Sequence, residues 1–289
     1  MSQTDRLAKV IARRGVASRR EAERFIEDGR VQVDGETVYH PGTPVTGKED
    51  IRVDGKPLPP PPRHVYYLLY KPRGTITGRN DPQGRKSVLD LVEHLSDRVE
   101  PVGRLDMDTE GALLLTNDGA LANALTHPRN EVPKRYIVKV WKEPDAKKMS
   151  RLRRGIHLED GRTAPARLRV VERTDTGNCW IEVTVTEGRN RLVRRMFEAI
   201  GHPVSKLRRE TFATLSIRGM ERGDVRPLTG EELARIQDIA EGTAASEAGH
   251  TFKYKKGFAR PKAAKVKPLH KKKSARKPNS KGPRGGGGR

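Results

Sequence analysis

Residues 102–126, VGRLDMDTEGALLLTNDGALANALT, contain the pattern on which the interpretation of the whole chain depends. The run Ala112–Leu115 is short and evenly apolar, which is typical of a buried strand and not of a surface helix. Turn residues follow it, and Asp118 can cap the short helix that comes next. The stretch therefore predicts a strand–turn–helix unit, and the loop before the strand carries Arg104 and Asp106 on this rigid support.

An arginine close to a carboxylate in a turn is not specific by itself, because a surface ion pair gives the same pattern and is the commoner case. The complete string GRLDMDTEGALLLTNDG is more informative. It resembles the catalytic motif of the pseudouridine synthases and, within them, of the RsuA/RluB family of ribosomal RNA enzymes. The resemblance implies that Asp106 is the catalytic residue and that Arg104 fills or supports the space left by a flipped uridine. Of the other carboxylates, Asp118 has its capping role, and Asp108 and Glu110 are predicted to be turn residues.

Positive charge dominates the composition. The 289 residues include 59 Lys/Arg against 37 Asp/Glu, a formal net charge of +22 that favours a polyanionic partner bound through phosphate contacts. The charge alone does not distinguish RNA from DNA or from an anionic membrane surface. No apolar run approaches the roughly 20 residues of a membrane span, and the N-terminus lacks the apolar core of a secretory signal, so we expect a cytoplasmic protein without membrane attachment. The single cysteine, Cys179, excludes an intramolecular disulfide and a cysteine-built metal site.

The N-terminal segment has the pattern of a separate small module. Leu7, Val10 and Ile11 form the apolar face of a first short helix, which a glycine ends. Ser18 and the glutamate three residues later match a capping box at the start of a second helix, and a strand with a tight turn follows at residues 31–35. Five arginines gather around these elements: Arg13, Arg14, Arg19, Arg20 and Arg30.

These arginines by themselves could form only a solvated charged surface. The string RLAKVIARRGVASRREAERFIEDGRVQVDG, however, resembles the small RNA-binding domain first known from the small-subunit ribosomal protein S-four. The resemblance covers nearly every position of the string. It implies that the five arginines grip the RNA backbone by shape and phosphate contacts and do not read individual bases.

A proline-rich segment with five prolines in residues 57–62 follows the module. Such a segment is stiff and extended and is typical of a spacer. A β-rich run at residues 65–70 then leads to a Pro/Gly turn that begins with Lys71. In the family the matching Lys-Pro-x-Gly element is packed beneath the active site, so the resemblance implies a supporting role for Lys71.

The next segments contain a loop, a predicted helix and a predicted strand. Residues 79–85 form a polar, turn-rich loop that is more similar to the RluB branch than to the RsuA branch, which favours large-subunit RNA as the substrate. Residues 87–95 are predicted to form a helix with four apolar residues facing inward. Alternation at residues 136–140 predicts a half-buried strand. A tyrosine in such a strand is most often a core aromatic, but the family has a tyrosine of this Lys-x-Tyr context against the target base, which implies an active-site role for Tyr136.

A second basic motif lies in the C-terminal half of the chain. Its string, EGRNRLVRRMFEAIGHPV, contains four arginines in seven residues, and these could form only a solvated face over a helix. The string also resembles the second strong motif of the family, in which an arginine pairs with the catalytic aspartate. Alignment assigns this role to Arg194, which would hold Asp106 ionised, since an opposite charge within a few ångströms favours the carboxylate. Arg189 and Arg191 are the alternatives, and we expect them on RNA phosphates.

The last 49 residues carry 15 Lys/Arg against 2 Asp/Glu and thus contribute 13 of the 22 net charges. They have no periodicity, which predicts a disordered basic tail that increases nonspecific RNA affinity. The predicted organisation is an S-four-type RNA-binding domain at residues 1–56, a proline-rich linker at 57–63, a catalytic domain at 64–240 and the tail at 241–289.

The resemblance implies an α+β protein whose mixed α/β pseudouridine synthase domain contains a central, largely antiparallel sheet. It implies an isomerase that converts a specific uridine of large-subunit (23S) ribosomal RNA to pseudouridine by base flipping and aspartate catalysis, acting as a monomer on rRNA or a pre-ribosomal particle. Small-subunit (16S) rRNA as substrate and a non-catalytic role in ribosome assembly are the alternatives; DNA binding is supported by charge alone. No metal, nucleotide or redox cofactor is expected, because the chain has no P-loop, GxGxxG or Cys/His cluster. Whether Asp106 adds to the anomeric carbon or removes a ribose proton is left open.

Overall fold

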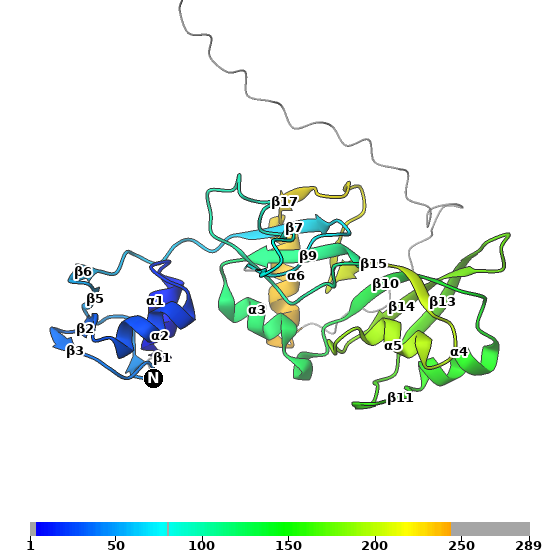
Figure 1. Ribbon diagram of the computed structural model, residues 1–289, viewed down its shortest axis with the longest axis horizontal. Coiled ribbons are helices and arrows are strands. Elements are labelled where there is room, and N and C mark those ends of the chain that lie inside the picture. The colour runs from blue at the N-terminus through cyan, green and yellow to red at the C-terminus, as the bar shows by residue number, and fades with distance from the viewer. Residues whose placement is uncertain (1–3, 80, 244–289) are drawn as a thin grey trace, which may run out of the picture.

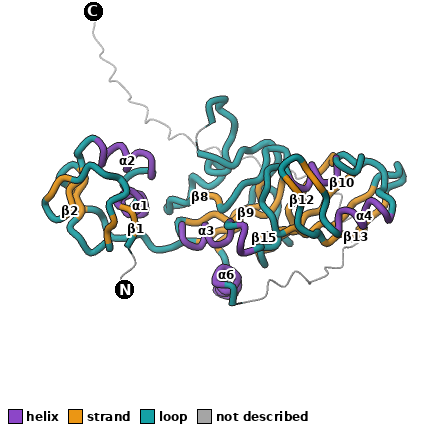
Figure 2. The backbone as a smooth tube through the Cα atoms, turned by 90° about the horizontal axis from the view of Figure 1, so that it is seen from below, coloured by secondary structure: helices purple, strands orange, loops and turns teal. Residues whose placement is uncertain are grey.

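The computed structural model describes residues 4–79 and 81–243. Figure 1 shows a small N-terminal unit, in blue, joined by an extended stretch to a larger unit built on one long sheet. Figure 2, turned by 90°, shows the same elongated arrangement, with the N-terminal unit at one end. The predicted basic tail lies outside the described residues, apart from its first three positions, and Glu241 at its start is the last residue of a helix.

The N-terminal unit packs two short helices against small sheets. α1 (Leu7–Arg13) and α2 (Arg19–Glu27) enclose its apolar core. The predicted capping box is confirmed, because Ser18 Oγ accepts a hydrogen bond from the Glu21 amide and the Glu21 carboxylate accepts one from the Ser18 amide. The remaining elements are short strands: β1 (Asp5–Arg6) with β4 (Pro44–Val45), and a sheet of β2 (Val31–Val33), β3 (Glu36–Thr37), β5 (Ile51–Val53) and β6 (Lys56–Pro57) in the order β3-β2-β5-β6.

The larger unit is organised around a nine-stranded sheet whose main path has the order β13-β14-β10-β15-β9-β7-β17. All of its paired strands are antiparallel except β9 and β15, so the expected largely antiparallel sheet is confirmed. Its strands are β7 (Tyr66–Lys71), β8 (Glu100–Pro101), β9 (Glu110–Thr116), β10 (Lys134–Val140), β13 (Arg167–Arg173), β14 (Cys179–Val185), β15 (Val204–Phe212), β16 (Leu215–Ser216) and β17 (Val225–Pro227). A separate hairpin joins β11 (His157–Leu158) to β12 (Gly161–Arg162).

The parallel pair β9–β15 divides the sheet into two halves, and we call this pair the seam. Only two positions pair across it, Arg208 with Glu110 and Arg209 with Gly111. Gly111 has φ +127°, and a Cβ there would overlap the backbone oxygen of Arg209, so the close approach requires glycine. Each half has its own apolar core, one around β10 and β14 and the other around β7 and β9.

Helices cover both halves (Figure 1). α4 (Ala146–Arg153) and α5 (Leu192–Glu198) pack on the β10–β14 half, while α3 (Gly119–Thr126) and α6 (Gly230–Glu241) pack together over one face of β7 and β9. A 3-10 turn, η1 (Pro128–Asn130), follows α3. Asp118 caps α3 as predicted, since its carboxylate accepts hydrogen bonds from the amides of Ala120 and Leu121. None of the described helices has the length and apolar character needed to span a bilayer.

Two predictions about this half of the chain are wrong. Residues 87–95 form consecutive turns and no helix, because Ser87 and Asp90 side chains bond to neighbouring amides and close the backbone locally. Glu110 is not a turn residue but the buried first residue of β9, where its carboxylate pairs with Arg222 at 2.7 Å. Cys179 is fully buried in β14, and burial raises the pKa of its thiol to about 11, so it is an inert core residue.

Candidate active site

The loop between β8 and β9 carries the predicted catalytic residue and is fixed by its backbone. Leu105, whose side chain is buried, exchanges two hydrogen bonds with the hydroxyl of Thr77, at 2.8 and 3.2 Å. The carbonyl of Met107 accepts a hydrogen bond from the amide of Gly74. Hydrogen bonds thus hold the backbone of Leu105 and of Met107, and Asp106 lies between these two residues.

Lys71 holds the loop at a third point. Its side chain is fully buried, and its ammonium donates hydrogen bonds to the carbonyl of Thr109 at 2.9 Å and of Pro72 at 3.1 Å. Burial lowers the pKa of Lys71 to about 8, although the nearby carboxylates of Asp106 and Asp108 act in the opposite direction. Lys71 therefore lies beneath the loop, as the resemblance implies, and connects it to the Pro/Gly turn after β7.

Two arginines of the second basic motif face this loop. Arg191 lies 3.7 Å from Asp106 and 3.6 Å from Asp108, measured between its Nη1 and the nearer carboxylate oxygens. Arg194 lies 2.9 Å from the Asp108 carboxylate, and it also donates hydrogen bonds to the carbonyls of Asp108 and Val204. Two guanidinium groups and two carboxylates thus form one balanced cluster at the end of α5.

The pairing predicted between Arg194 and Asp106 is therefore wrong in its partner. Arg194 lies on the buried side of α5, where the Val204 carbonyl holds its guanidinium beside Asp108. Arg191 caps α5 in the left-handed region, with φ +46°, and this turn of the backbone brings its side chain to Asp106. Burial lowers the pKa of Arg194, whereas Arg191 stays half exposed at the loop.

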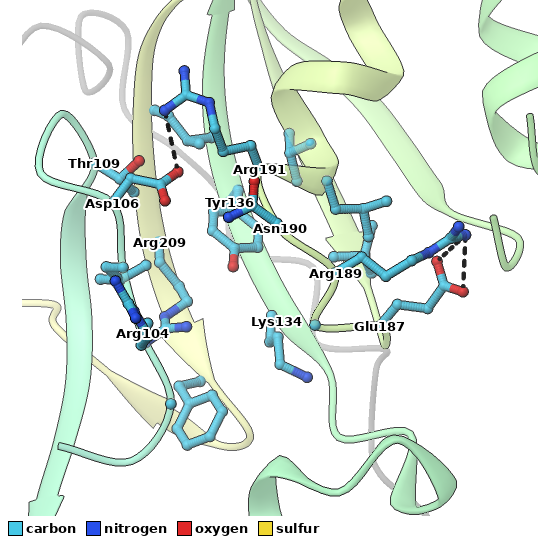
Figure 3. A pocket seen from close by; sticks show the side chains of 18 of the residues that line it. Arg104, Asp106, Thr109, Lys134, Tyr136, Glu187, Arg189, Asn190, Arg191 and Arg209 are labelled. Carbon is cyan, nitrogen blue, oxygen red and sulfur yellow. Dashed lines mark hydrogen bonds and ion pairs between the residues drawn. The ribbon is translucent and has the colours of Figure 1, made fainter. Parts of the chain in front are cut away.

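A cavity of about 460 Å³ opens beside Asp106. Its walls come from the Asp106 loop on one side of the seam and from β10, β15 and the segment before α5 on the other. Figure 3 shows Asp106, Tyr136, Lys134 and Arg209 around a common space, with the ion pairs Arg191–Asp106 and Arg189–Glu187 dashed. The predicted site residues Arg104, Asp106, Tyr136, Arg189 and Arg191 all line this cavity.

Comparison with known proteins identifies this arrangement. Residues 65–199 match the family model described as RNA pseudouridylate synthase, and residues 5–51 match the S4 domain. The protein named ribosomal large subunit pseudouridine synthase B from Bacillus subtilis is 48% identical over 238 residues, which are 82% of this chain and 97% of that relative. The protein of the same name from Yersinia pestis is 41% identical over 82% of this chain and 76% of its own length. The chain belongs to the RNA pseudouridine synthases.

A solved structure supports the same assignment. It is described as the crystal structure of pseudouridylate synthase, is 29% identical to this chain and superimposes with a TM-score of 0.58 over 80% of this chain and 99% of that one. The N-terminal unit is thus an S4 domain and the larger unit a pseudouridine synthase domain, which makes the chain an isomerase.

In this pseudouridine synthase, not every arginine of the second motif is free for RNA. Arg189 donates hydrogen bonds to the carbonyls of Asp160, Gly161 and Arg162 and pairs with the carboxylates of Asp160 and Glu187. Arg195 pairs with the same Asp160 at 2.5 Å, and these contacts lower the pKa of Asp160 to about 2. Arg189 therefore fastens the β11–β12 hairpin to the cavity rim, which differs from the predicted role as a phosphate contact.

The arginines of the S4 domain have more open surroundings. Arg13 pairs with Asp5 at 3.0 Å, and Arg14 donates to the carbonyl of Pro59 in the proline-rich segment. Arg30 holds Asp54 with two hydrogen bonds and stacks over the ring of Phe25, 4.1 Å away. Arg19 and Arg20 are exposed on α2 and have no ion pair within the residues that the structure describes.

Two basic residues of the cavity were missed from the sequence: Lys134 and Arg209. Lys134 lies two positions before Tyr136 on β10, so the strand alternation could have placed it on the same face. Arg209 carries no such signal, because the sequence gives no indication that β15 lies between β9 and β10. The described residues contain no group of three or more His, Cys, Asp or Glu side chains that could hold a metal ion.

Proposed function

We propose that this pseudouridine synthase isomerises a specific uridine of large-subunit ribosomal RNA, with Asp106 as its catalytic residue. The relatives named above support the substrate, since both are named ribosomal large subunit pseudouridine synthase B and both align over about four-fifths of this chain. The S4 domain supports RNA as the partner.

One observation carries the choice of Asp106. It is the cavity-lining carboxylate of a loop whose backbone is bonded at Leu105, Met107 and Thr109, so its position is fixed from both sides. Its carboxylate accepts no hydrogen bond from the described residues, and Arg191 lies at ion-pair distance. A carboxylate held in place beside an open cavity is suited to react with a ribose that enters it.

The resemblance to the pseudouridine synthase family supports the following chemistry. A stacked uridine cannot reach the cavity, so the enzyme flips it out of its stem at an expense of a few kcal/mol. Arg104 supports the space left in the RNA. Asp106 then acts on the ribosyl–uracil bond, either by adding to the anomeric carbon or by removing a ribose proton. The uracil rotates and reattaches through C5, and the C5 proton leaves with Tyr136 nearby.

The other parts of the chain bind the RNA substrate in this proposal. We assign residues 1–56 to the S4 domain, 57–63 to the linker and 64–240 to the catalytic domain, and we expect the basic residues from 241 onward to add nonspecific RNA affinity. The proposal has the protein act in the cytoplasm as a monomer during ribosome biogenesis.

Pseudouridine mapping of ribosomal RNA tests the proposal. Carbodiimide adducts and primer extension would be compared between cells with and without the gene. One large-subunit stop should disappear and should return with the wild-type protein but not with Asp106→Asn. A stop lost from small-subunit RNA would change the substrate, and an unchanged map of both RNAs would contradict the assignment.

A further inference from the structure

Arg209 is the most deeply buried charged side chain of the cavity wall, with 2% of its surface exposed. It lies in the middle of β15, opposite Tyr136 of β10 and opposite Gly111 of β9. Its Nε donates a hydrogen bond to the carbonyl of Ala112 at 2.7 Å, and its guanidinium carbon lies 4.9 Å from the ring centre of Phe212. These contacts fix the plane of the guanidinium on the same face of the sheet as Tyr136.

One nitrogen of this guanidinium forms no hydrogen bond with the described residues. Nη2 of Arg209 is buried and has no hydrogen-bond partner among the described residues. A buried donor without a partner destabilises a fold, because its hydration is lost and nothing replaces it. A molecule bound in the cavity is able to complete the hydrogen bonding of this guanidinium, because Arg209 lines the cavity wall.

The charges around Arg209 indicate the charge of the molecule that binds there. The described lining residues include two carboxylates, Asp106 and Glu187, and these lie beside Arg191 and Arg189. Lys134 is next to Arg209, and among the described residues its ammonium donates hydrogen bonds to the carbonyls of Val132 and Thr186.

The electrostatic effect on Lys134 supports this description. Burial lowers its pKa to about 8, and the positive charge of Arg209 acts in the same direction. This part of the cavity therefore has excess positive charge in a desolvated setting, which favours a ligand that carries or develops negative charge.

The proposed reaction develops negative charge on the uracil by either route. If Asp106 adds to C1′, a C1′–O bond forms and the C1′–N1 bond breaks. If a ribose proton is removed instead, a C1′–C2′ double bond forms as the same C1′–N1 bond breaks. In both cases the electron pair of that bond goes to the uracil, which becomes an anion with its charge spread over N1, C5 and the two carbonyl oxygens. The uracil gives up this charge when its C5 bonds to C1′. In the first route the C1′–O bond breaks and its electron pair returns to the Asp106 carboxylate; in the second the C1′–C2′ double bond takes the proton back at C2′. C5 then loses its proton and N1 gains one.

We propose that the guanidinium of Arg209 binds a carbonyl oxygen of the flipped uracil and stabilises the uracil anion while the base is detached from the ribose. The inference rests on the proposed function, because it names a group that acts on the uracil of that reaction. Arg209 touches the reacting base and is thus a catalytic residue in addition to Asp106. Its rigid support is suited to charge stabilisation, because the donor needs no reorientation during the reaction.

The position also explains why the seam is built around this residue. Gly111 permits β9 to approach the backbone of Arg209, and Ala112 on the same strand orients the guanidinium. Asp106 lies in the loop that leads into β9, and Arg209 lies on β15, which pairs with β9. The group acting on the ribose and the group receiving the base therefore keep a fixed separation.

Single-turnover kinetics of Arg209→Met and Arg209→Lys test the proposal. The probe is an in vitro transcript of large-subunit RNA labelled with tritium at uridine C5, and the readout is tritium release. The rate should fall by roughly 10²–10³-fold in Arg209→Met and less in Arg209→Lys, while the Kd for the transcript stays within about threefold.

A matched control comes from the neighbouring position. Arg208→Lys changes a buried arginine of the same strand whose side chain lies on the opposite face of the sheet and pairs with Glu210. It should lose stability in a similar way but keep its turnover rate. Circular dichroism and urea unfolding of each variant separate a folding defect from a chemical one.

A change in the leaving group gives a second measurement. Its result would not change if Arg209 had only a structural role. Transcripts with 5-fluorouridine at all uridines form a more stable uracil anion, so loss of 5-fluorouridine by Arg209→Met should be impaired about tenfold less than the reaction of uridine. An equal defect on both transcripts would overturn the inference, as would a normal rate with weakened, salt-dependent binding, which indicates a phosphate contact. A wild-type protein inactive on every ribosomal transcript would instead contradict the proposed function.

Discussion

The arginines of the S4 domain and those around Asp106 belong to the same chain but are held in different ways. Arg19 and Arg20 project from α2 into solvent, Arg30 pairs with the exposed Asp54, and Arg13 pairs with the partly buried Asp5. Around the cavity, Arg194 and Arg209 are buried, and carbonyl groups at the ends of β-strands or within them fix their guanidinium planes.

The difference teaches how one residue type serves two tasks. An exposed arginine gives affinity through charge, which tolerates small displacements and weakens as salt is added. A buried arginine has lost its hydration and its freedom to move, so it acts on one atom at one place. Substitutions in the first set should change binding, whereas substitutions in the second should change turnover and stability.

The largest effect is expected for the carboxylate of Asp106. Asp106→Asn should reduce single-turnover tritium release at least about 10³-fold, with the transcript Kd within twofold of wild type. Asp108→Asn is the matched variant, because it removes the other carboxylate of the cluster but no reacting group. A loss in Asp108→Asn as large as that in Asp106→Asn would contradict the separate roles.

Arg194→Gln tests the buried set next. It leaves Asp108 with the more distant Arg191 alone and removes the hydrogen bond to Val204. Because Asp108 is partly solvated, the free energy of unfolding should fall by about 1–3 kcal/mol, less than for a fully buried pair. Arg195→Gln, one position along the same helix, should lose clearly less stability, because its ion pair with Asp160 is solvated. Urea unfolding measures both, and equal losses would show that burial does not distinguish them.

The pH dependence of stability isolates Lys71. Its folded pKa is about 8, below the ordinary 10.5, so the unfolded chain binds more protons between these values and stability rises with pH in that window. From pH 7.5 to 9.5 the wild type should gain about 2 kcal/mol relative to Lys71→Met. Urea unfolding at both pH values gives the difference, and identical pH profiles for the two proteins would contradict it.

The smallest effects belong to the exposed set. Arg19→Gln with Arg20→Gln should raise the transcript Kd by about three- to tenfold and reduce the slope of log K against log salt by about 1.5, without changing the single-turnover rate. Arg30→Gln should change the Kd by less than about twofold, because this side chain is already engaged with Asp54 and Phe25. A larger effect from Arg30 than from the pair on α2 would break the comparison.

The fold features that were predictable are those set by local chemistry. The Ser18 capping box, the Asp118 cap and the buried strand β9 depend on residues within a few positions of one another, so the sequence pattern contains them. The capping box of Thr229 and Glu232 at the start of α6 has the same pattern and could have been recognised. At residues 87–95 the apolar spacing of a helix is present, but side-chain bonds from Ser87 and Asp90 close turns instead.

The site was predictable only as far as the resemblance and strand alternation reach. Asp106, Tyr136 and Arg191 come together at the cavity, yet the pairing of Arg191 with Asp106 depends on the left-handed turn at Arg191, which the sequence does not specify. Arg209 depends on strand order, since its place beside Asp106 comes from the pairing of β15 with β9. Contacts between segments far apart in the chain are what local patterns omit.

The seam also determines the stage of the protein's synthesis at which its active site can form. Its two paired positions, Gly111 and Arg209, are about 100 residues apart, so the Asp106 loop leaves the ribosome long before the strand that completes its cavity. Loop closure over such a separation is slow and comes late in folding. A nascent chain that ends before β15 can form its S4 domain and engage RNA, but it has no closed site in which to act. Binding therefore precedes catalysis in the order in which this molecule is made.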